Sequence, residues 1–281
     1  MISILHKMFL ENVLDNIESK YKGQLQLTEE KLYTYSNILN IPLYYNLASF
    51  KKNPDYGLYI KLQEKSKLET INYIIEKIVE NDYNENLVLF LYSYITNTIL
   101  NSELDKYTDN FIYSQNKLTE KKKMNIRSKV SSIIQSELYL IKYDSKIEEY
   151  KNETQAIEEE TINLLNAIFT KFHYFTFGKQ VFEEGFKNFQ KINKKKNSLF
   201  KVIYKIIAKV KDIVTRSKKY SLYSAYHYYH SKDDYLTYNG ISLTTILDEA
   251  NEKATKIIEL VSEEIYYKKK NNKLLEKILN K

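Results

Sequence analysis

The sequence contains no cysteine and no tryptophan, and it has only five glycines and two prolines among its 281 residues. Without cysteine, the chain has no disulfides, no cysteine-ligated zinc, no iron–sulfur cluster and no thiol nucleophile. Folds that are rich in strands use far more glycine and proline in their turns, so the scarcity of both favours helices joined by polar loops. These absences predict an all-α protein.

Arginine is also scarce, so the positive charge comes almost entirely from lysine. The chain carries 43 lysines and arginines against 36 acidic residues, a formal charge of +7, and its only arginines are Arg127 and Arg216. Proteins that read nucleic acids rely on the bidentate geometry of arginine, whereas these lysines are interspersed with acidic residues. We therefore do not expect a nucleic acid as the partner.

No targeting or membrane-spanning segment stands out in the sequence. His6, Lys7 and Glu11 interrupt the first apolar run before it reaches the length of a signal peptide. The most apolar stretch runs from Leu87 to Leu100 and contains several polar residues. A helix needs about 20 apolar residues to span a bilayer, so this stretch is too short. We expect this stretch to form a buried central helix, and we expect the protein to be cytoplasmic.

Apolar residues recur three and four positions apart along most of the chain, which indicates amphipathic helices. The simplest division is a single all-α domain over residues 1–265, followed by a polar, lysine-rich tail over residues 266–281. Within the domain, we expect Thr28 to cap the N-terminus of a helix. We also expect residues 81–84 to separate two helices.

One predicted helix carries polar residues at a regular spacing. Asn97, Asn101 and Asp105 are four residues apart, which places them on one stripe of a helix that is otherwise apolar. The stripe has two interpretations. It either forms an interior hydrogen-bond network that fixes the register of the helix, because buried carboxamides need partners, or it faces a polar cavity that has a function.

The segment that contains this stripe, LYSYITNTILNSELDKY from Leu91 to Tyr107, resembles the signature helix of the bacterial zinc-dependent phospholipase C-like family. The family pattern is roughly Y-G-F-I-C-H-x-x-L-D-S-x-x-H-P-Y, and its two histidines and its aspartate bind metal. In this register Asn97 stands at the first histidine, Asn101 at the aspartate and Asp105 at the second histidine. The resemblance implies a multi-helix bundle with the phospholipase C/P1 nuclease fold.

Further segments resemble the family in the same order along most of the chain. His6 stands at the histidine of the family's N-terminal segment, and Lys61 replaces the histidine of a later one. In a third segment Arg127 stands where the family has a histidine, and Ser131 stands where it has a glutamate. The resemblance thus implies a metal site in which most ligands are replaced.

The replacements bear directly on catalysis. A catalytic zinc site needs at least three histidine, carboxylate or thiolate ligands and a bound water. At the matched positions only His6 and Asp105 could still bind zinc, whereas Lys61 and Arg127 would place cations where a dication should bind. Without the metal, no water is activated as a nucleophile. The resemblance therefore implies a pseudoenzyme without a cofactor.

Two histidines outside the matched positions leave a metal site open as the alternative. His227 and His230 are three residues apart and could bind zinc together with His6 and Asp105. The other interpretation of their tyrosine-rich segment is a surface or an interface between proteins.

The stretch from Ser198 to Lys218 predicts a cationic amphipathic helix. Its basic side consists of Lys201, Lys205, Lys209 and Arg216. Such a helix either lies on an anionic membrane or packs in the core with its lysines in water.

The sequence as a whole predicts a noncatalytic binding or structural protein. We expect its partner to be another protein or a second copy of the chain, because tyrosine is enriched at interfaces and the chain has 27 tyrosines. The alternatives are a zinc-dependent phospholipase or phosphodiesterase with rearranged ligands, and a protein that binds anionic lipid at a membrane surface.

Overall fold

The computed structural model describes residues 2–22, 25–44, 67–113, 154–173, 179–196, 237–238 and 241–279. Most of these residues lie in α-helices, which confirms the prediction of an all-α protein. The elements of the first half are α1 (Ile2–Asn16), α2 (Ser19–Lys22), α3 (Glu29–Ser36), the 3₁₀-helix η1 (Ile38–Tyr44), α5 (Lys67–Glu80) and α6 (Glu85–Tyr113). The later elements are α8 (Glu159–His173), α9 (Lys179–Lys196), β1 (Thr237–Tyr238), β2 (Ile241–Ser242), α12 (Leu243–Tyr267) and α13 (Asn272–Leu279).

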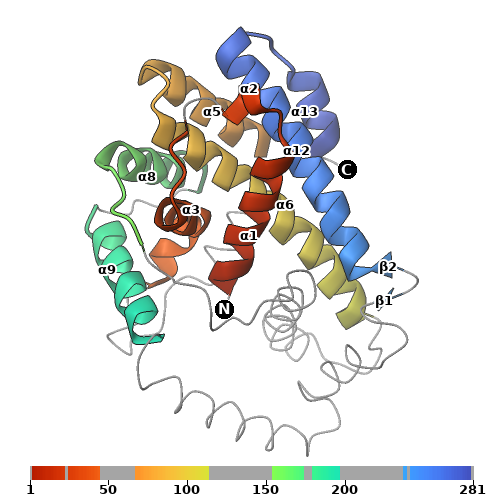
Figure 1. Cartoon of the computed structure of the whole chain (residues 1–281), viewed down its shortest axis with the longest axis horizontal. Helices are drawn as coiled ribbons and strands as arrows, with labels where there is room; N and C mark the ends of the chain where they lie inside the picture. Colours follow the sequence, from red (N-terminus) through yellow and green to blue (C-terminus); the bar gives the residue numbers. More distant parts are fainter. Residues whose placement is uncertain are drawn as a thin grey trace, which may run out of the picture.

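α6 is the central helix of the bundle, with α1, α3, α5 and α12 packed around it (Figure 1). Every residue from Asn86 to Asn97 is buried, so this half of the helix has no side that faces water. A helix that is apolar all round belongs in an interior. The prediction that residues 87–100 form a buried central helix is therefore confirmed.

α12 lies alongside α6 and supplies the largest helix-to-helix contact of the described part. Its buried residues follow the helical repeat: Ala250, Ala254, Ile257, Ile258, Val261 and Ile265. A buried polar contact adds to this packing. The hydroxyl of Tyr92 on α6 donates to the carbonyl oxygen of Tyr21 at 2.9 Å and lies 2.7 Å from Ser262 Oγ on α12. Tyr92 thus joins α6, α12 and α2.

α9 approaches η1 unusually closely on the other side of the bundle. A Cβ atom at Gly185 would lie 2.5 Å from the carbonyl oxygen of Ile41, a distance that side chains do not tolerate. Nearby, the rings of Tyr33 and Phe189 stack with their centroids 5.7 Å apart. Glycine at this position therefore lets two backbones touch while aromatic rings pack beside them.

The predicted helix boundaries are confirmed at two places. The side chain of Thr28 accepts a hydrogen bond from the backbone nitrogen of Lys31 at 3.2 Å, so it caps α3. Residues 81–84 separate α5 from α6, and two of them, Asp82 and Tyr83, have φ angles of 51° and 60°. Such left-handed residues commonly end helices.

The C-terminal segment corrects the expectation of a polar tail. Lys268, with a φ of 56°, ends α12, and the lysine run forms a turn that leads into α13. α13 buries Leu275 and Leu279 and packs against α5 and α12. The apolar residues that follow the lysine run have helical spacing, so this segment forms an amphipathic helix.

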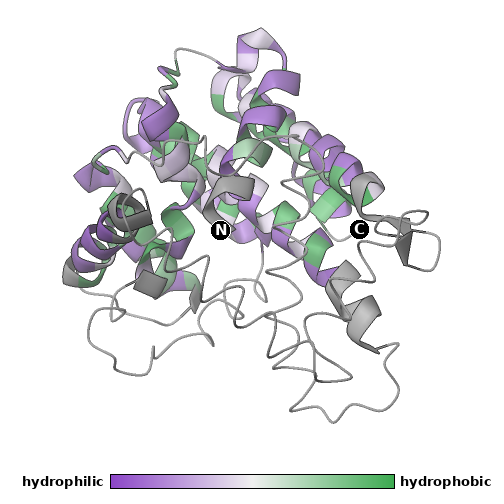
Figure 2. Ribbon diagram, turned by 60° about the horizontal axis from the view of Figure 1, so that its bottom comes forward, coloured by the Kyte–Doolittle hydropathy of each residue, from purple (hydrophilic) through white to green (hydrophobic). Residues whose placement is uncertain are grey.

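Hydrophobic residues gather on the sides of the helices that face other helices, and hydrophilic residues cover the outer sides (Figure 2). No helix in the described ranges is both long enough and apolar enough to cross a membrane.

Candidate functional site

His6 is a buried histidine on α1. Its side chain is 2% exposed, and its Nδ1 has no hydrogen-bond partner among the described residues. Burial lowers the pKa of His6 to about 4, so the ring is neutral at neutral pH. A neutral imidazole is the form that binds metals, but it is also the form that an apolar interior prefers.

Asn97 is a buried asparagine that joins two helices. Its Nδ2 donates hydrogen bonds to the carbonyl oxygen of Ser36 at 2.8 Å and to that of Ser93 at 2.9 Å. Ser36 is the last residue of α3, where backbone carbonyls lack partners within their own helix. Both protons of the amide nitrogen are thereby used. Such bonds are what the first interpretation of the polar stripe, an interior hydrogen-bond network, predicts.

The stripe that begins at Asn97 runs from the interior toward the surface. Asn101 is also buried, whereas Asp105 is partly exposed. The three side chains therefore do not share one environment, although they share one line on α6. A metal site needs ligands that converge on a point.

Three lysines gather around Glu103, which is two residues from both Asn101 and Asp105 and therefore lies on roughly the opposite side of α6 from the stripe. The ammonium groups of Lys253 on α12 and Lys106 on α6 lie 3.0 Å from its carboxylate, and Lys67 on α5 donates to Ser102 Oγ at 3.4 Å. Burial opposes ionisation of Glu103, but the hydrogen bonds from Lys253 and Lys106 outweigh it and hold the pKa of Glu103 below its ordinary value. Burial, together with repulsion from Lys253 and Lys106, lowers the pKa of Lys67.

This lysine cluster joins α5, α6 and α12, and it has consequences for metal binding. Its lysines outnumber its one glutamate, so the cluster itself disfavours a dication. Sequence analysis missed the cluster because its members come from three distant parts of the chain. Local spacing carries no signal for such contacts.

The described residues do not fit a zinc centre. Within the described ranges, no group of three or more histidine, aspartate or glutamate side chains could hold a metal ion. Asn97 uses its amide nitrogen for contacts between helices, and Asn101 and Asp105 differ in their exposure. The remaining predicted site residues lie outside the described residues: Lys61, Arg127, Ser131, Lys201, Lys205, Lys209, Arg216, His227 and His230. Their roles stay predictions.

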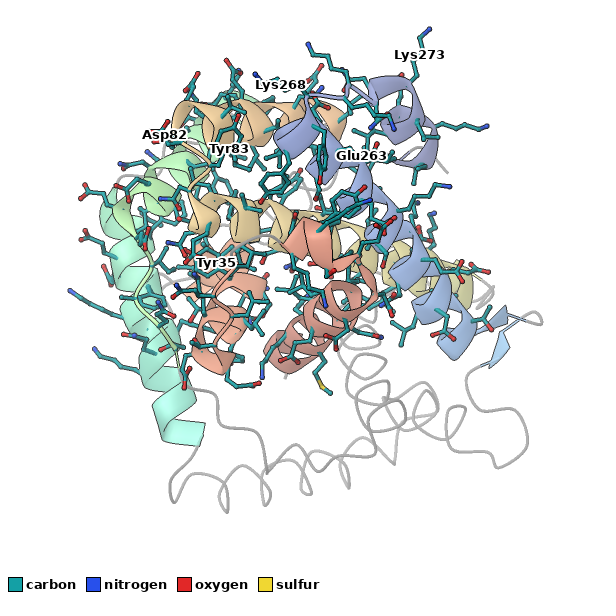
Figure 3. All side chains as sticks on the ribbon, turned by 45° about the horizontal axis from the view of Figure 1, so that its top comes forward. Tyr35, Asp82, Tyr83, Glu263, Lys268 and Lys273 are labelled. Atoms are coloured by element: carbon teal, nitrogen blue, oxygen red, sulfur yellow. The ribbon has the colours of Figure 1, made fainter. Side chains whose placement is uncertain are left out.

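One end of the bundle carries exposed tyrosines, a feature that sequence analysis did not find. We define the tyrosine end as residues 79–84, where α5 is followed by α6, together with residues 266–274, where α12 is followed by α13. Tyr83 and Tyr266 stack with centroids 6.5 Å apart, and Tyr267 packs edge-on against Tyr21, also at 6.5 Å. Figure 3 labels Asp82, Tyr83, Lys268 and Lys273 on this end. The pair Tyr266-Tyr267 before three lysines was the available signal.

No family model matches the chain, and no curated protein or solved structure shows a match. The resemblance to the phospholipase C-like family therefore stays a prediction. The function of the chain is inferred from its own residues and contacts.

Proposed function

We propose that this chain is a noncatalytic binding protein whose helical scaffold resembles the zinc-dependent phospholipase C-like family. The observation that carries the proposal is the bonding of Asn97. At a position where the resemblance expects a metal-binding histidine, the amide nitrogen donates to two backbone carbonyl oxygens, on α3 and on α6. These two bonds give Asn97 a structural role, which explains an asparagine at this position without a metal.

The charges on the outer half of α6 support the same proposal. Lys67, Lys106 and Lys253 surround Glu103, which lies between Asn101 and Asp105 along α6. On this side of α6 the described residues offer ammonium groups in place of the imidazole and carboxylate ligands that zinc needs. The bonds of Asn97 and the ion pair between Lys253 and Glu103 instead hold neighbouring helices together.

The tyrosine end supports a role in binding. The tyrosine side chains Tyr83, Tyr266 and Tyr267 are 42%, 37% and 59% exposed. Tyrosine contributes a large apolar ring and a polar hydroxyl, and it is enriched at protein interfaces. A framework that is closed inside and aromatic at one end is suited to holding a partner.

Metal content and hydrolysis test the noncatalytic part of the proposal. Elemental analysis of the purified chain should find no stoichiometric zinc. Hydrolysis of a chromogenic phosphodiester and of phosphatidylcholine vesicles should equal the buffer blank, with or without added zinc. Stoichiometric zinc together with hydrolysis that His6→Ala abolishes would overturn the proposal. Thr170→Ala, on the exposed side of α8, is the matched control, because it leaves the buried residues unchanged.

The orphaned Nδ1 of His6 favours one alternative, a phospholipase or phosphodiesterase with rearranged ligands. In that case His6 would act with Asp105, His227 and His230. Zinc binding measured by calorimetry should then disappear in both His6→Gln and His227→Gln. Under the noncatalytic proposal, neither variant changes the heat of zinc addition.

A further inference from the structure

The tyrosine end holds most of the exposed apolar surface of the described part. Among the described residues six large apolar side chains are exposed, and five of them lie at the tyrosine end: Val79, Tyr83, Tyr266, Tyr267 and Leu274. They come from both turns, and the stacked rings of Tyr83 and Tyr266 bring the two turns together. Exposed apolar groups that gather in one place mark surfaces that bind other molecules.

The backbone of the same two turns is strained in a way that glycine would relieve. Tyr83 and Lys268 have φ angles of 60° and 56°, a left-handed conformation that is unfavourable for residues with a Cβ atom. The strain at Tyr83 is partly offset by the stacking of its ring on that of Tyr266. Lys268 is exposed, and its ammonium group forms no ion pair with any described residue. A contact with another molecule would explain why this position has a lysine instead of a glycine.

The charges of the tyrosine end form two poles of opposite sign. The α5–α6 turn carries Glu80 and Asp82, which we name the acidic pole. The α12–α13 turn carries Lys268, Lys270 and Lys273, which we name the basic pole. Within the described part of the chain, no ion pair joins the two poles. Glu80 also pairs with Lys77 on its own helix, so the charges that have no ion pair among the described residues are Asp82 in the acidic pole and the three lysines of the basic pole. These charges remain available to a charge on another molecule.

The arrangement of the poles decides between two kinds of partner. An anionic lipid surface would attract the basic pole but repel the acidic pole beside it. A second copy related by a two-fold axis would place each acidic pole against the partner's basic pole, because both copies use the same surface in opposite directions. The tyrosines between the poles would then form the centre of the contact.

We propose that the tyrosine end is a self-complementary surface through which two copies of this chain associate. The inference rests on the proposed function, since it names the partner of the binding protein. Its central tyrosines lose water on association, and its poles set the relative orientation of the two copies.

Charge exchange between the poles tests the pairing. The acidic-pole variant combines Glu80→Lys with Asp82→Asn, and the basic-pole variant combines Lys270→Glu with Lys273→Glu. By sedimentation velocity, the wild type should dimerise, and each variant alone should dimerise at least about tenfold more weakly, because like charges then face each other. An equal mixture of the two variants should recover dimers, because both contacts are again of opposite sign. Lys187→Glu with Lys191→Glu, exposed on α9, is the matched control and should dimerise like the wild type.

A second variant separates association from folding. Lys268→Gly should raise the urea midpoint of unfolding, because glycine relieves the left-handed strain, yet it should weaken dimerisation because a charge of the basic pole is lost. Loss of dimer in a better folded protein cannot be attributed to misfolding.

Three outcomes would overturn the inference. These are a wild type that stays monomeric up to about 100 µM, a dimer that neither pole variant weakens, and a monomer that instead sediments with phosphatidylserine vesicles. A monomer without zinc or hydrolysis still leaves the noncatalytic proposal standing. Zinc-dependent hydrolysis removes that proposal whatever the state of association.

Discussion

Two groups of tyrosines in the described part, one in the interior and one at the tyrosine end, differ in what their side chains contact. Around α6, the hydroxyl of Tyr92 has two polar partners, and that of Tyr35 lies 3.3 Å from Thr161 Oγ1. Burial raises the pKa of Tyr35 to about 12. At the tyrosine end, Tyr83 and Tyr267 contact other rings and remain largely exposed. The same residue type thus specifies the interior in one region and leaves a surface for a partner in the other.

The largest difference between the two groups of tyrosines should appear when one ring of each is truncated. Tyr33→Ala should lower the free energy of unfolding by about 3–5 kcal/mol, because a buried ring stacked on Phe189 is lost. Tyr267→Ala should lower it by about 1 kcal/mol or less, since that ring is mostly exposed. Urea unfolding followed by circular dichroism measures both values. Equal losses would mean that the two regions do not differ.

Removal of the Asn97 amide should have the next largest effect on the interior. Asn97→Leu leaves the carbonyl oxygens of Ser36 and Ser93 without this donor, and we expect a loss of about 1–3 kcal/mol. Asn163→Leu, at an exposed position of α8, is the control and should change stability by about 0.5 kcal/mol or less. If both variants unfold at the same urea concentration, the amide does not join the helices as described.

His6 should make the interior sensitive to acid. Its pKa is about 4 in the folded chain, below the ordinary 6.5, so the unfolded chain binds the proton more readily. Stability is therefore fully present above pH 6.5 and falls as the pH drops toward 4. Between pH 7 and pH 5 the wild type should lose about 2 kcal/mol more than His6→Leu. Parallel acid dependence in the two proteins would show that His6 titrates normally.

The smallest expected effect concerns a single hydroxyl group. Tyr92→Phe should cost about 1 kcal/mol, because the ring remains while its hydrogen bonds are lost. Tyr267→Phe should leave the urea midpoint unchanged. A double-mutant cycle with Ser262→Ala would measure how much of the loss belongs to the contact between α6 and α12.

Local patterns in the sequence were sufficient to predict much of the fold. Apolar spacing indicated the helices, the Thr28 cap needs only the residues next to it, and the most apolar stretch of the sequence identified the centre of α6. The C-terminal helix was missed because three consecutive lysines outweighed the apolar spacing after them. Leu275 is buried only because α13 packs against α5 and α12.

The candidate site was predictable only up to the helix that carries it. Spacing placed Asn97 on a polar stripe, but its partner Ser36 belongs to another helix, which spacing cannot reveal. Lys7 shows the same limit. It counted as a polar interruption in the sequence, whereas the fold buries it between Glu11 and Glu29, whose hydrogen bonds and charges outweigh burial and raise its pKa. Such pairings depend on tertiary contacts.

The contact between Gly185 and Ile41 has a consequence for the recognition of distant relatives. Main-chain atoms set the distance between α9 and η1 at this point, so even a methyl group on residue 185 would push the helix away. Side chains elsewhere in the bundle can be exchanged for others of similar volume. In any homologue that keeps this architecture, we therefore expect a glycine in the middle of the helix that faces the proline-containing turn, even where most other residues have changed.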